Sequence, residues 1–295
     1  MKWEGNRQSD NVEDRRDEGG GGGGGGLGGL IGGRGVGIGT IVVALVGGWI
    51  FGITPLTIRG LLSGGAPAEQ VSQAPAHKPP ADDRMASFVS TILADTEDVW
   101  KDVFSRGNAA YQAPRLVLFR GSTPTSCGQG QAAMGPFYCP ADQKVYIDLG
   151  FYETLKTRLG APGDFAQAYV IAHEVGHHVQ NLLGISARME QMHGRVSPVE
   201  YNTMSVRLEL QADCLAGVWA HHAQNARQLL EQGDVEEAMN AAARIGDDAL
   251  QRGSGGAVVP ESFTHGTSAQ RQRWFGTGLQ NGSVKGCDTF SARNL

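Results

Sequence analysis

The sequence has 295 residues, enough for one domain with additional segments. Its formal net charge is -5, so no basic field favours nucleic acid as a partner. Hydrophobic residues make up 40%, and the 44 glycines, many of them near the N-terminus, account for part of this low share. We therefore expect a folded domain accompanied by segments that bury little, and no nucleic-acid-binding function.

The first 84 residues are predicted to lie outside the folded domain. Residues 1–34 are polar and then rich in glycine, with eight consecutive glycines at 19–26, and are predicted to be disordered and cytoplasmic. Residues 35–58 are uncharged, and as a helix they would extend roughly 36 Å, enough to cross a hydrocarbon core of about 30 Å. Residues 59–84 are rich in Pro and Ala and read as a spacer, so the domain is predicted at 85–295.

The uncharged run is predicted to be a single-pass transmembrane anchor. Positive residues flank it on both sides, with Arg15, Arg16 and Arg34 before it and Arg59 and Lys78 after it. The excess before the run predicts a cytoplasmic N-terminus and a domain on the non-cytoplasmic side.

Two features of this region bear on the anchor. Gly48 and Gly52 are four residues apart, a spacing that favours helix–helix contact in a bilayer, so a homo-oligomer through this helix is a further prediction. A cleaved signal peptide is the alternative, because Ala66–Ala68 resembles a cleavage site. The length of the apolar run favours the uncleaved anchor.

Within 85–295, hydrophobic periodicity predicts an α+β fold. Apolar residues from Phe88 to Phe104 recur at helical spacing, and short strands are expected at Arg115–Phe119 and Lys144–Leu149. Further helices are predicted at 151–159, 164–183, 200–226, 234–252 and 267–280. The result is a small sheet followed by a helical half. We expect Val145–Asp148 to be an exposed strand edge that could pair with a substrate peptide.

Four cysteines are present: Cys127, Cys139, Cys214 and Cys287. None forms a Cys-x-x-Cys pair, which argues against a cysteine zinc knuckle. An even number in an exported domain predicts two disulfides. Cys127 and Cys139 flank a Gly-rich loop and form the favoured pair, which leaves Cys214 with Cys287. Buried free thiols are the alternative.

The pentapeptide His173–His177 reads His-Glu-Val-Gly-His and lies in a predicted helix. Residues four apart share a helix face, so both imidazoles are expected to point into one pocket. Glu174 lies about 100° around the helix axis, beside a metal ion but not bound to it, where it can take a proton from a metal-bound water. The alternative is a helix whose histidines cap or pack.

A second motif supplies the third ligand. Two histidines and one glutamate form a known zinc set that leaves one position for water, and Glu209 in the next long helix can complete it. Asp213, one turn later, can accept a hydrogen bond from the outer nitrogen of a ligand histidine. Two carboxylates on a solvated face are the alternative. Their apolar neighbours predict burial, where an unpaired carboxylate is costly.

These stretches resemble a family, the bacterial neutral zinc metallopeptidases of the YpfJ type. The matching segments are Gly135–Pro140, Val145–Asp148, Ala172–Gln180, Glu209–Gly217 and Thr264–Ser268. The resemblance implies a zincin-like domain with a gluzincin-like site, in which His173, His177 and Glu209 hold zinc. It also implies that the predicted anchor lies in the bacterial inner membrane, with a periplasmic catalytic domain. The metzincin pattern needs glycine three residues after the second histidine, where this chain has Gln180.

The predicted function is a membrane-anchored zinc peptidase that acts on a peptide or protein substrate, with Zn²⁺ as cofactor and Glu174 as general base. His265, in a turn before a helix, and Tyr201 are candidate donors to the oxyanion. Each has an ordinary alternative, since His265 can make a local hydrogen bond and Tyr201 can pack at a helix start. Two other functions stay open: a metal-stabilised scaffold without activity, and a zinc amidase acting on cell-wall peptides.

Overall fold

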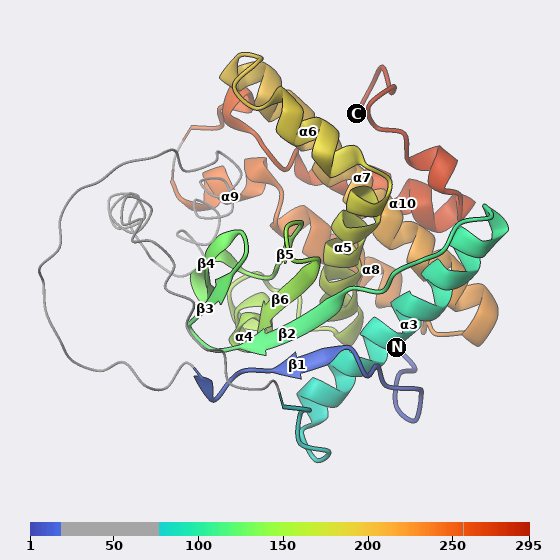
Figure 1. Cartoon of the computed structure of the whole chain (residues 1–295). Coiled ribbons are helices and arrows are strands. Elements are labelled where there is room, and N and C mark those ends of the chain that lie inside the picture. The colour runs from blue at the N-terminus through green and yellow to red at the C-terminus, as the bar shows by residue number, and fades with distance from the viewer. Residues whose placement is uncertain (19–76, 256) are drawn as a thin grey trace, which may run out of the picture.

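The computed structural model describes residues 1–18, 77–255 and 257–295 (Figure 1). A four-stranded sheet has the strand order β1-β2-β6-β5. Its strands are β1 (Val12–Asp14), β2 (Arg115–Phe119), β6 (Lys144–Asp148) and β5 (Phe137–Cys139). The pairs β1–β2 and β2–β6 are parallel, and β5 runs antiparallel to β6. A separate hairpin joins β3 (Ser122–Thr125) to β4 (Gly128–Gln131).

A continuous run of apolar residues in β2 explains why the sheet is buried on both faces. In β2, Leu116 and Leu118 belong to the main core, whereas Val117 and Phe119 belong to a smaller cluster on the opposite face. Side chains two residues apart share one face of a strand, so apolar residues at every position cover both faces. The strands predicted at 115–119 and 144–149 are confirmed, although the second ends at Asp148.

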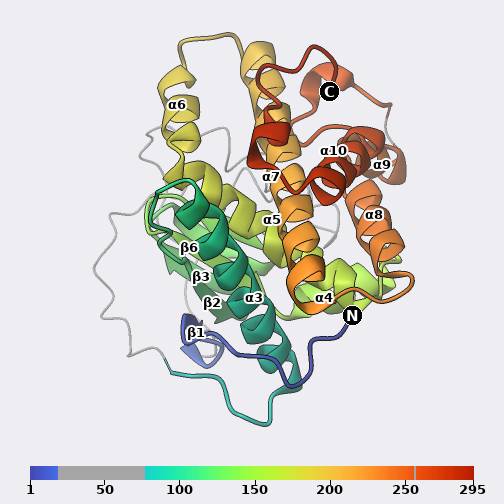
Figure 2. The ribbon, with the colours of Figure 1, turned by 90° about the vertical axis from the view of Figure 1, so that its right-hand side faces the viewer.

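Helices form most of the remaining structure, as Figure 2 shows from the side. They are α3 (Arg84–Arg106), α4 (Gly150–Thr157), α5 (Asp164–Leu182), α6 (Ile185–Met192), α7 (Pro198–Arg227), α8 (Asp234–Arg244), α9 (Asp247–Gly253) and α10 (Ser268–Asn281). The predicted α+β class is therefore confirmed. The predicted helix at 234–252 is instead two helices, because Gly246 adopts an extended conformation between α8 and α9. Helix α6 was not predicted.

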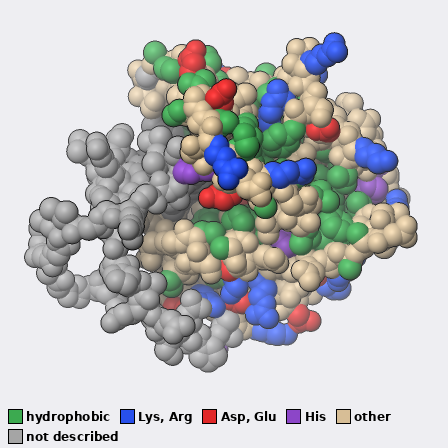
Figure 3. All heavy atoms as spheres, turned by 45° about the horizontal axis from the view of Figure 1, so that its top comes forward, with side chains coloured by type: hydrophobic (Ala, Val, Ile, Leu, Met, Phe, Trp, Pro, Cys, Tyr) green, Lys and Arg blue, Asp and Glu red, His purple; other side chains and the backbone are tan. Residues whose placement is uncertain are grey.

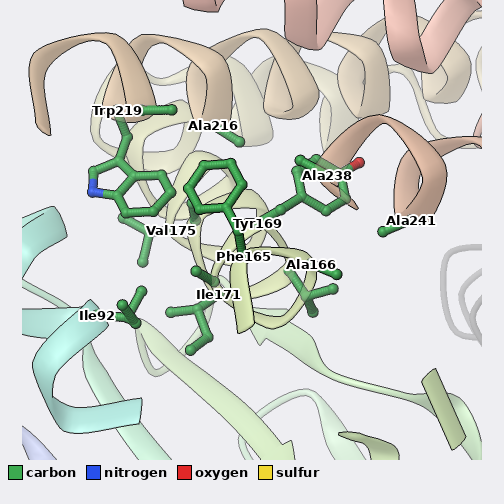
Figure 4. Packing of buried hydrophobic residues seen from close by; sticks show 14 of the residues in the cluster. Ile92, Phe165, Ala166, Tyr169, Ile171, Val175, Ala216, Trp219, Ala238 and Ala241 are labelled. Carbon is green, nitrogen blue, oxygen red and sulfur yellow. The ribbon is translucent and has the colours of Figure 1, made fainter. Parts of the chain in front are cut away.

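Helix α5 lies at the centre of the core. Figure 4 shows its residues Phe165, Ile171 and Val175 between Ile92 of α3 and Trp219 of α7. The rings of Phe165 and Trp219 stack with centroids 5.8 Å apart. Full burial of one such apolar side chain contributes roughly 1.5–3 kcal/mol, so this packing fixes α5, which carries the His-Glu-x-x-His motif, against its neighbours.

The surface mixes charge and apolar side chains. On the face shown in Figure 3, Lys and Arg side chains lie among Asp and Glu side chains, with hydrophobic side chains between them. Large apolar side chains that are exposed lie at helix ends and in loops: Leu183, Val199, Val258 and Val259. The buried polar groups, rather than this surface, therefore indicate where the functional site lies.

Residues 1–18 are part of the folded domain. Strand β1 pairs with β2, and Trp3 Nε1 donates to Asp164 Oδ2 at 3.1 Å. The Ser9 hydroxyl and the Asn11 amide both donate to Oε1 of Glu97, at 2.5 and 2.7 Å. The prediction of disorder is therefore wrong for residues 1–18, and so is the domain start at residue 85. A strand of three residues is too short to give a periodic signal.

The predicted membrane anchor at 35–58 lies outside the described residues, as does most of the spacer at 59–84. None of the helices within 1–18, 77–255 and 257–295 is both long and apolar enough to cross a bilayer. Because β1 and β2 share a sheet, residues 12–14 and 115–119 must lie on the same side of any membrane. A cytoplasmic N-terminus joined by one crossing to a periplasmic domain is incompatible with this sheet.

Candidate metal centre

The three predicted metal ligands lie together. His173 and His177 come from adjacent turns of α5, and Glu209 comes from α7. One ligand atom from each residue lies within 4.8 Å of the others. The Nε2 atoms of His173 and His177 are 3.2 and 3.5 Å from the two carboxylate oxygens of Glu209. The structure thus brings two imidazole nitrogens and one carboxylate to a single point.

A glycine allows α7 to approach the histidine helix so closely. A Cβ atom added at Gly176 would lie 3.0 Å from the carbonyl oxygen of Ala212 and 3.2 Å from its Cα. These are backbone atoms, which cannot move aside as the end of a side chain could. Gly176 therefore permits the contact between α5 and α7 that places Glu209 over the two histidines.

The Nδ1 atom of each histidine, which faces away from Glu209, has a hydrogen-bond partner. His173 Nδ1 lies 2.8 Å from Oδ1 of Asp213, and His177 Nδ1 lies 2.9 Å from Oε1 of Gln180. A carboxylate or amide oxygen only accepts, so each Nδ1 carries a proton, and each Nε2 would present its lone pair when a metal ion binds. Two such nitrogens and one carboxylate suit zinc and leave one coordination position for water. The described residues therefore fit a catalytic zinc site.

Asp213 is itself firmly held, as expected for the residue that orients His173. Arg271 donates from Nε to Oδ2 at 2.8 Å and from Nη2 to Oδ1 at 2.9 Å, and the Tyr169 hydroxyl donates to Oδ1 at 2.5 Å. Burial raises the pKa of Asp213, but the charges of Arg271 and His173 outweigh it and hold this pKa at about 2. Asp213 is thus ionised at neutral pH.

Neither Arg271 nor Tyr169 was among the predicted site residues. Tyr169 lies four residues before His173, so helical spacing already placed both on one face of α5. Arg271 lies on α10, 58 residues from Asp213, and no local pattern joins them. Only the packing of α10 against α7 brings this guanidinium to the site.

Glu174 lines the same cavity as the ligand cluster, and it is 7% exposed. Burial raises the pKa of Glu174 above its ordinary value, although the nearby His177 and His173 oppose the change. A carboxyl group with a raised pKa can both accept a proton and return it. This environment suits the predicted role as general base.

The cavity has a volume of about 320 Å³ and opens beside strand β5. Residues 135–138, which lead into and form the start of β5, line one side of it. The expectation that Val145–Asp148 is an exposed edge is wrong, because β6 pairs with both β2 and β5. The edge strand next to the cavity is β5.

His265 and Tyr201 both line this cavity. His265 Nδ1 lies 3.2 Å from Oδ1 of Asp247, while Oδ2 of Asp247 accepts backbone N–H groups of residues 264–266 at 2.6–3.0 Å. Burial lowers the pKa of His265, but the hydrogen bond to Asp247 and the charge of Glu209 outweigh it, so this pKa lies above its ordinary value. Tyr201 lies in the first turn of α7, and its ring contacts that of His193.

Asp247 was missed in the sequence. It begins α9, 18 residues before His265, and nothing in the sequence pattern links the two. The turn at 264–266 closes back on Asp247 because Gly266 adopts a φ of +90°, which other residues rarely adopt. Asp247 and His265 are therefore in contact only because the chain folds back at this turn.

Both predicted disulfides are confirmed. Cys127 bonds to Cys139, and Cys214 of α7 bonds to Cys287 in a short 3₁₀ helix at Val284–Cys287. The second bridge ties the C-terminal segment to the helix that carries Glu209 and Asp213.

Comparison with known proteins agrees with this geometry. Residues 1–290 match the family described as "Putative neutral zinc metallopeptidase". The "Uncharacterized protein YpfJ" of Escherichia coli strain K12 is 53% identical over 291 residues, covering 98% of this chain and 99% of that protein. The "Uncharacterized protein Mb2605" of Mycobacterium bovis is 44% identical over 208 residues, covering 67% of this chain and 68% of that protein. No solved structure gives a significant match. The chain therefore belongs to the neutral zinc metallopeptidase family.

Proposed function

We propose that this protein is a zinc-dependent peptidase that hydrolyses peptide bonds. The observation that carries the proposal is the convergence of His173, His177 and Glu209, with Glu174 in the same cavity. When bound, zinc would lower the pKa of a water molecule to about 7 and polarise the scissile carbonyl. The residues of the chain supply the proton transfers and the orientation.

Glu174 takes one proton from the attacking water as the new C–O bond forms. It then delivers that proton to the nitrogen of the leaving amine as the C–N bond breaks, so the reaction consumes one water molecule. The His265 ring, held by Asp247, donates from Nε2 to the carbonyl oxygen as negative charge develops there. Tyr201 is the second candidate for this donor.

The substrate is proposed to be an extended peptide that pairs with strand β5. Three observations support this: β5 is an edge of the sheet, it lies next to the cavity, and residues 135–138 line the cavity wall. Addition of a strand to an exposed edge is a common way to bind a peptide backbone. Association with a membrane through residues 35–58 is also proposed. Because β1 pairs with β2, residues 12–14 and 115–119 would then lie on one side of the bilayer, so the proposed association is not a single crossing.

Two alternatives differ in what they require of the site. A purely structural zinc is usually held by four protein ligands, whereas the group found among the described residues has three. The position of Glu174 in the cavity also favours catalysis over a scaffold role. A zinc amidase acting on cell-wall peptides would use the same chemistry, so only the choice of substrate separates it from a peptidase.

Removal of the metal is expected to abolish hydrolysis. The full chain, purified in detergent and freed of metal with a chelator, would be assayed on a broad peptide library and on peptidoglycan stem peptides. Activity should return with one equivalent of zinc, because the cluster provides one site. Hydrolysis that survives removal of the metal would contradict the proposal. Cleavage of stem peptides alone would favour the amidase.

His265→Ala is expected to reduce kcat/KM by about 10²–10³, the usual effect of losing one oxyanion donor. Zinc affinity should not change, because His265 is not in the ligand cluster. Tyr201→Phe, which removes only a hydroxyl from the same cavity, is the matched comparison and should remain active. Steady-state kinetics measure both variants. A large loss in Tyr201→Phe with normal activity in His265→Ala would assign the role to Tyr201.

A further inference from the structure

A chain of hydrogen bonds leaves the metal site through His177 and has no part in the proposed proton transfers. His177 Nδ1 lies 2.9 Å from Oε1 of Gln180. Gln180 Nε2 donates to the carbonyl oxygen of Leu208 at 2.7 Å and to Oε1 of Gln211 at 3.1 Å. Gln211 Nε2 in turn donates to the carbonyl oxygen of Cys287 at 2.9 Å. We refer to His177, Gln180, Gln211 and Cys287 as the amide relay.

The carbonyl oxygen of Cys287 determines which group donates and which accepts in every hydrogen bond of the amide relay. The carbonyl of Cys287 can only accept, so Gln211 must present Nε2 to it and turn Oε1 toward Gln180. Gln180 must therefore donate to Gln211 and turn its own oxygen toward His177. The carbonyl of Leu208 requires the same orientation of Gln180 independently. His177 is left with one option, which is to carry its proton on Nδ1.

Burial makes these orientations costly to reverse. Gln180 and Cys287 are fully buried, and Gln211 is 8% exposed. If the side-chain amide of Gln180 or Gln211 were rotated by 180°, its oxygen would lie against another acceptor and its NH₂ group would lose an acceptor inside the protein. The amide relay is therefore a rigid support rather than a set of exchangeable surface contacts.

The Cys214–Cys287 disulfide lies at the end of the amide relay. Cys214 is three residues after Gln211 on α7, and its bridge holds Cys287 against that helix. The carbonyl that accepts from Gln211 thus belongs to a residue that is covalently attached to α7. The other disulfide, Cys127–Cys139, has no member in the relay.

We infer that the amide relay orients His177 for metal binding and that the Cys214–Cys287 disulfide supports it. Gln180 and Gln211 are positioning residues, as Asp213 is for His173, but they act through neutral amides. The inference rests on the proposed zinc site. Its consequence is that reduction of one particular disulfide weakens metal binding.

The test measures the zinc dissociation constant of the full chain by competition with a chelator. Gln180→Met keeps a side chain of similar length but removes the acceptor, and it should weaken zinc binding about 10–100-fold. Gln211→Met should have a smaller effect, because Gln180 still donates to Leu208. Gln224→Met is the matched control on α7, since its side-chain oxygen accepts from the backbone N–H of Leu230, which is not part of the amide relay.

The disulfide is tested with two double variants. Cys214→Ala/Cys287→Ala should weaken zinc binding, whereas Cys127→Ala/Cys139→Ala should leave it unchanged, although each loses one bridge. Unfolding of each metal-free variant in urea separates loss of stability from loss of affinity. A merely structural role would lower the unfolding midpoint and leave the zinc affinity of the folded protein unchanged.

The outcomes separate this inference from the proposed function. An unaltered chain that binds no zinc would contradict the proposed function itself. Zinc binding that is normal in the unaltered chain and equally tight in Gln180→Met would overturn the amide relay alone. Equal weakening by both disulfide variants would overturn the link to Cys287.

Discussion

Glu174→Gln is expected to reduce the rate of peptide hydrolysis sharply while bound zinc stays at one equivalent. Glutamine has the same shape as glutamate but cannot take a proton from water, so the general-base contribution is lost. Such contributions are typically about 10²–10⁴-fold in rate. Zinc should remain because the ligand atoms come from His173, His177 and Glu209. The measurements are kcat on a cleaved library peptide and metal content after dialysis.

Glu190→Gln is the matched control for this variant. Glu190 is a carboxylate that lines the same cavity but is exposed and lies on α6. Its loss should leave kcat close to that of the unaltered chain. Equal turnover by Glu174→Gln and the unaltered protein would remove the basis for the enzyme proposal. Loss of zinc in Glu174→Gln would instead show that Glu174 helps to bind the metal.

Glu209→Ala is expected to lose most of its bound zinc and, with it, all activity. Burial raises the pKa of Glu209, but the two histidines outweigh it and hold this pKa well below its ordinary value. Glu209 is therefore the only anionic member of the ligand group at neutral pH. Removal of this carboxylate should weaken zinc binding by more than the roughly 10–100-fold that is typical when a residue that only orients a ligand is lost. Chelator competition measures the change.

Glu209→Gln separates charge from shape at this position. It keeps an oxygen that can reach the metal but removes the negative charge, so its zinc affinity should lie between those of the unaltered chain and Glu209→Ala. Zinc at normal stoichiometry and affinity in Glu209→Ala would place the third ligand elsewhere. An affinity of Glu209→Gln equal to that of Glu209→Ala would show that the charge alone matters.

The ligand set could be predicted from the sequence because its parts are local. His173 and His177 are one helical turn apart, as are Glu209 and Asp213, so each pair must share a helix face wherever the helix lies. The two strands at 115–119 and 144–148 were also found, since their β-branched and aromatic residues give a signal within a few positions. The Gly-rich loop between Cys127 and Cys139 favoured that pair, and elimination then left Cys214 with Cys287.

Other parts of the site depend on residues that are distant in the chain. Arg271 reaches Asp213 across 58 positions, and Asp247 reaches His265 across a turn. Neither contact changes the periodicity of its own segment, so no local pattern predicts it. The same holds for Gln211, whose acceptor at Cys287 is 76 residues away.

The sequence by itself thus determined most of the helices, the candidate metal ligands and the cysteine pairs, because local spacing and residue chemistry control them. Only the tertiary structure decided that residues 1–18 complete the sheet, that β5 is the edge beside the cavity, and that two supporting networks hold the histidines. Strands of three residues bury too little to form alone, and they are stable only when a neighbouring strand pairs with them. The hydrogen bonds to Asp213 and Gln180 likewise exist only once α5, α7 and α10 have packed together.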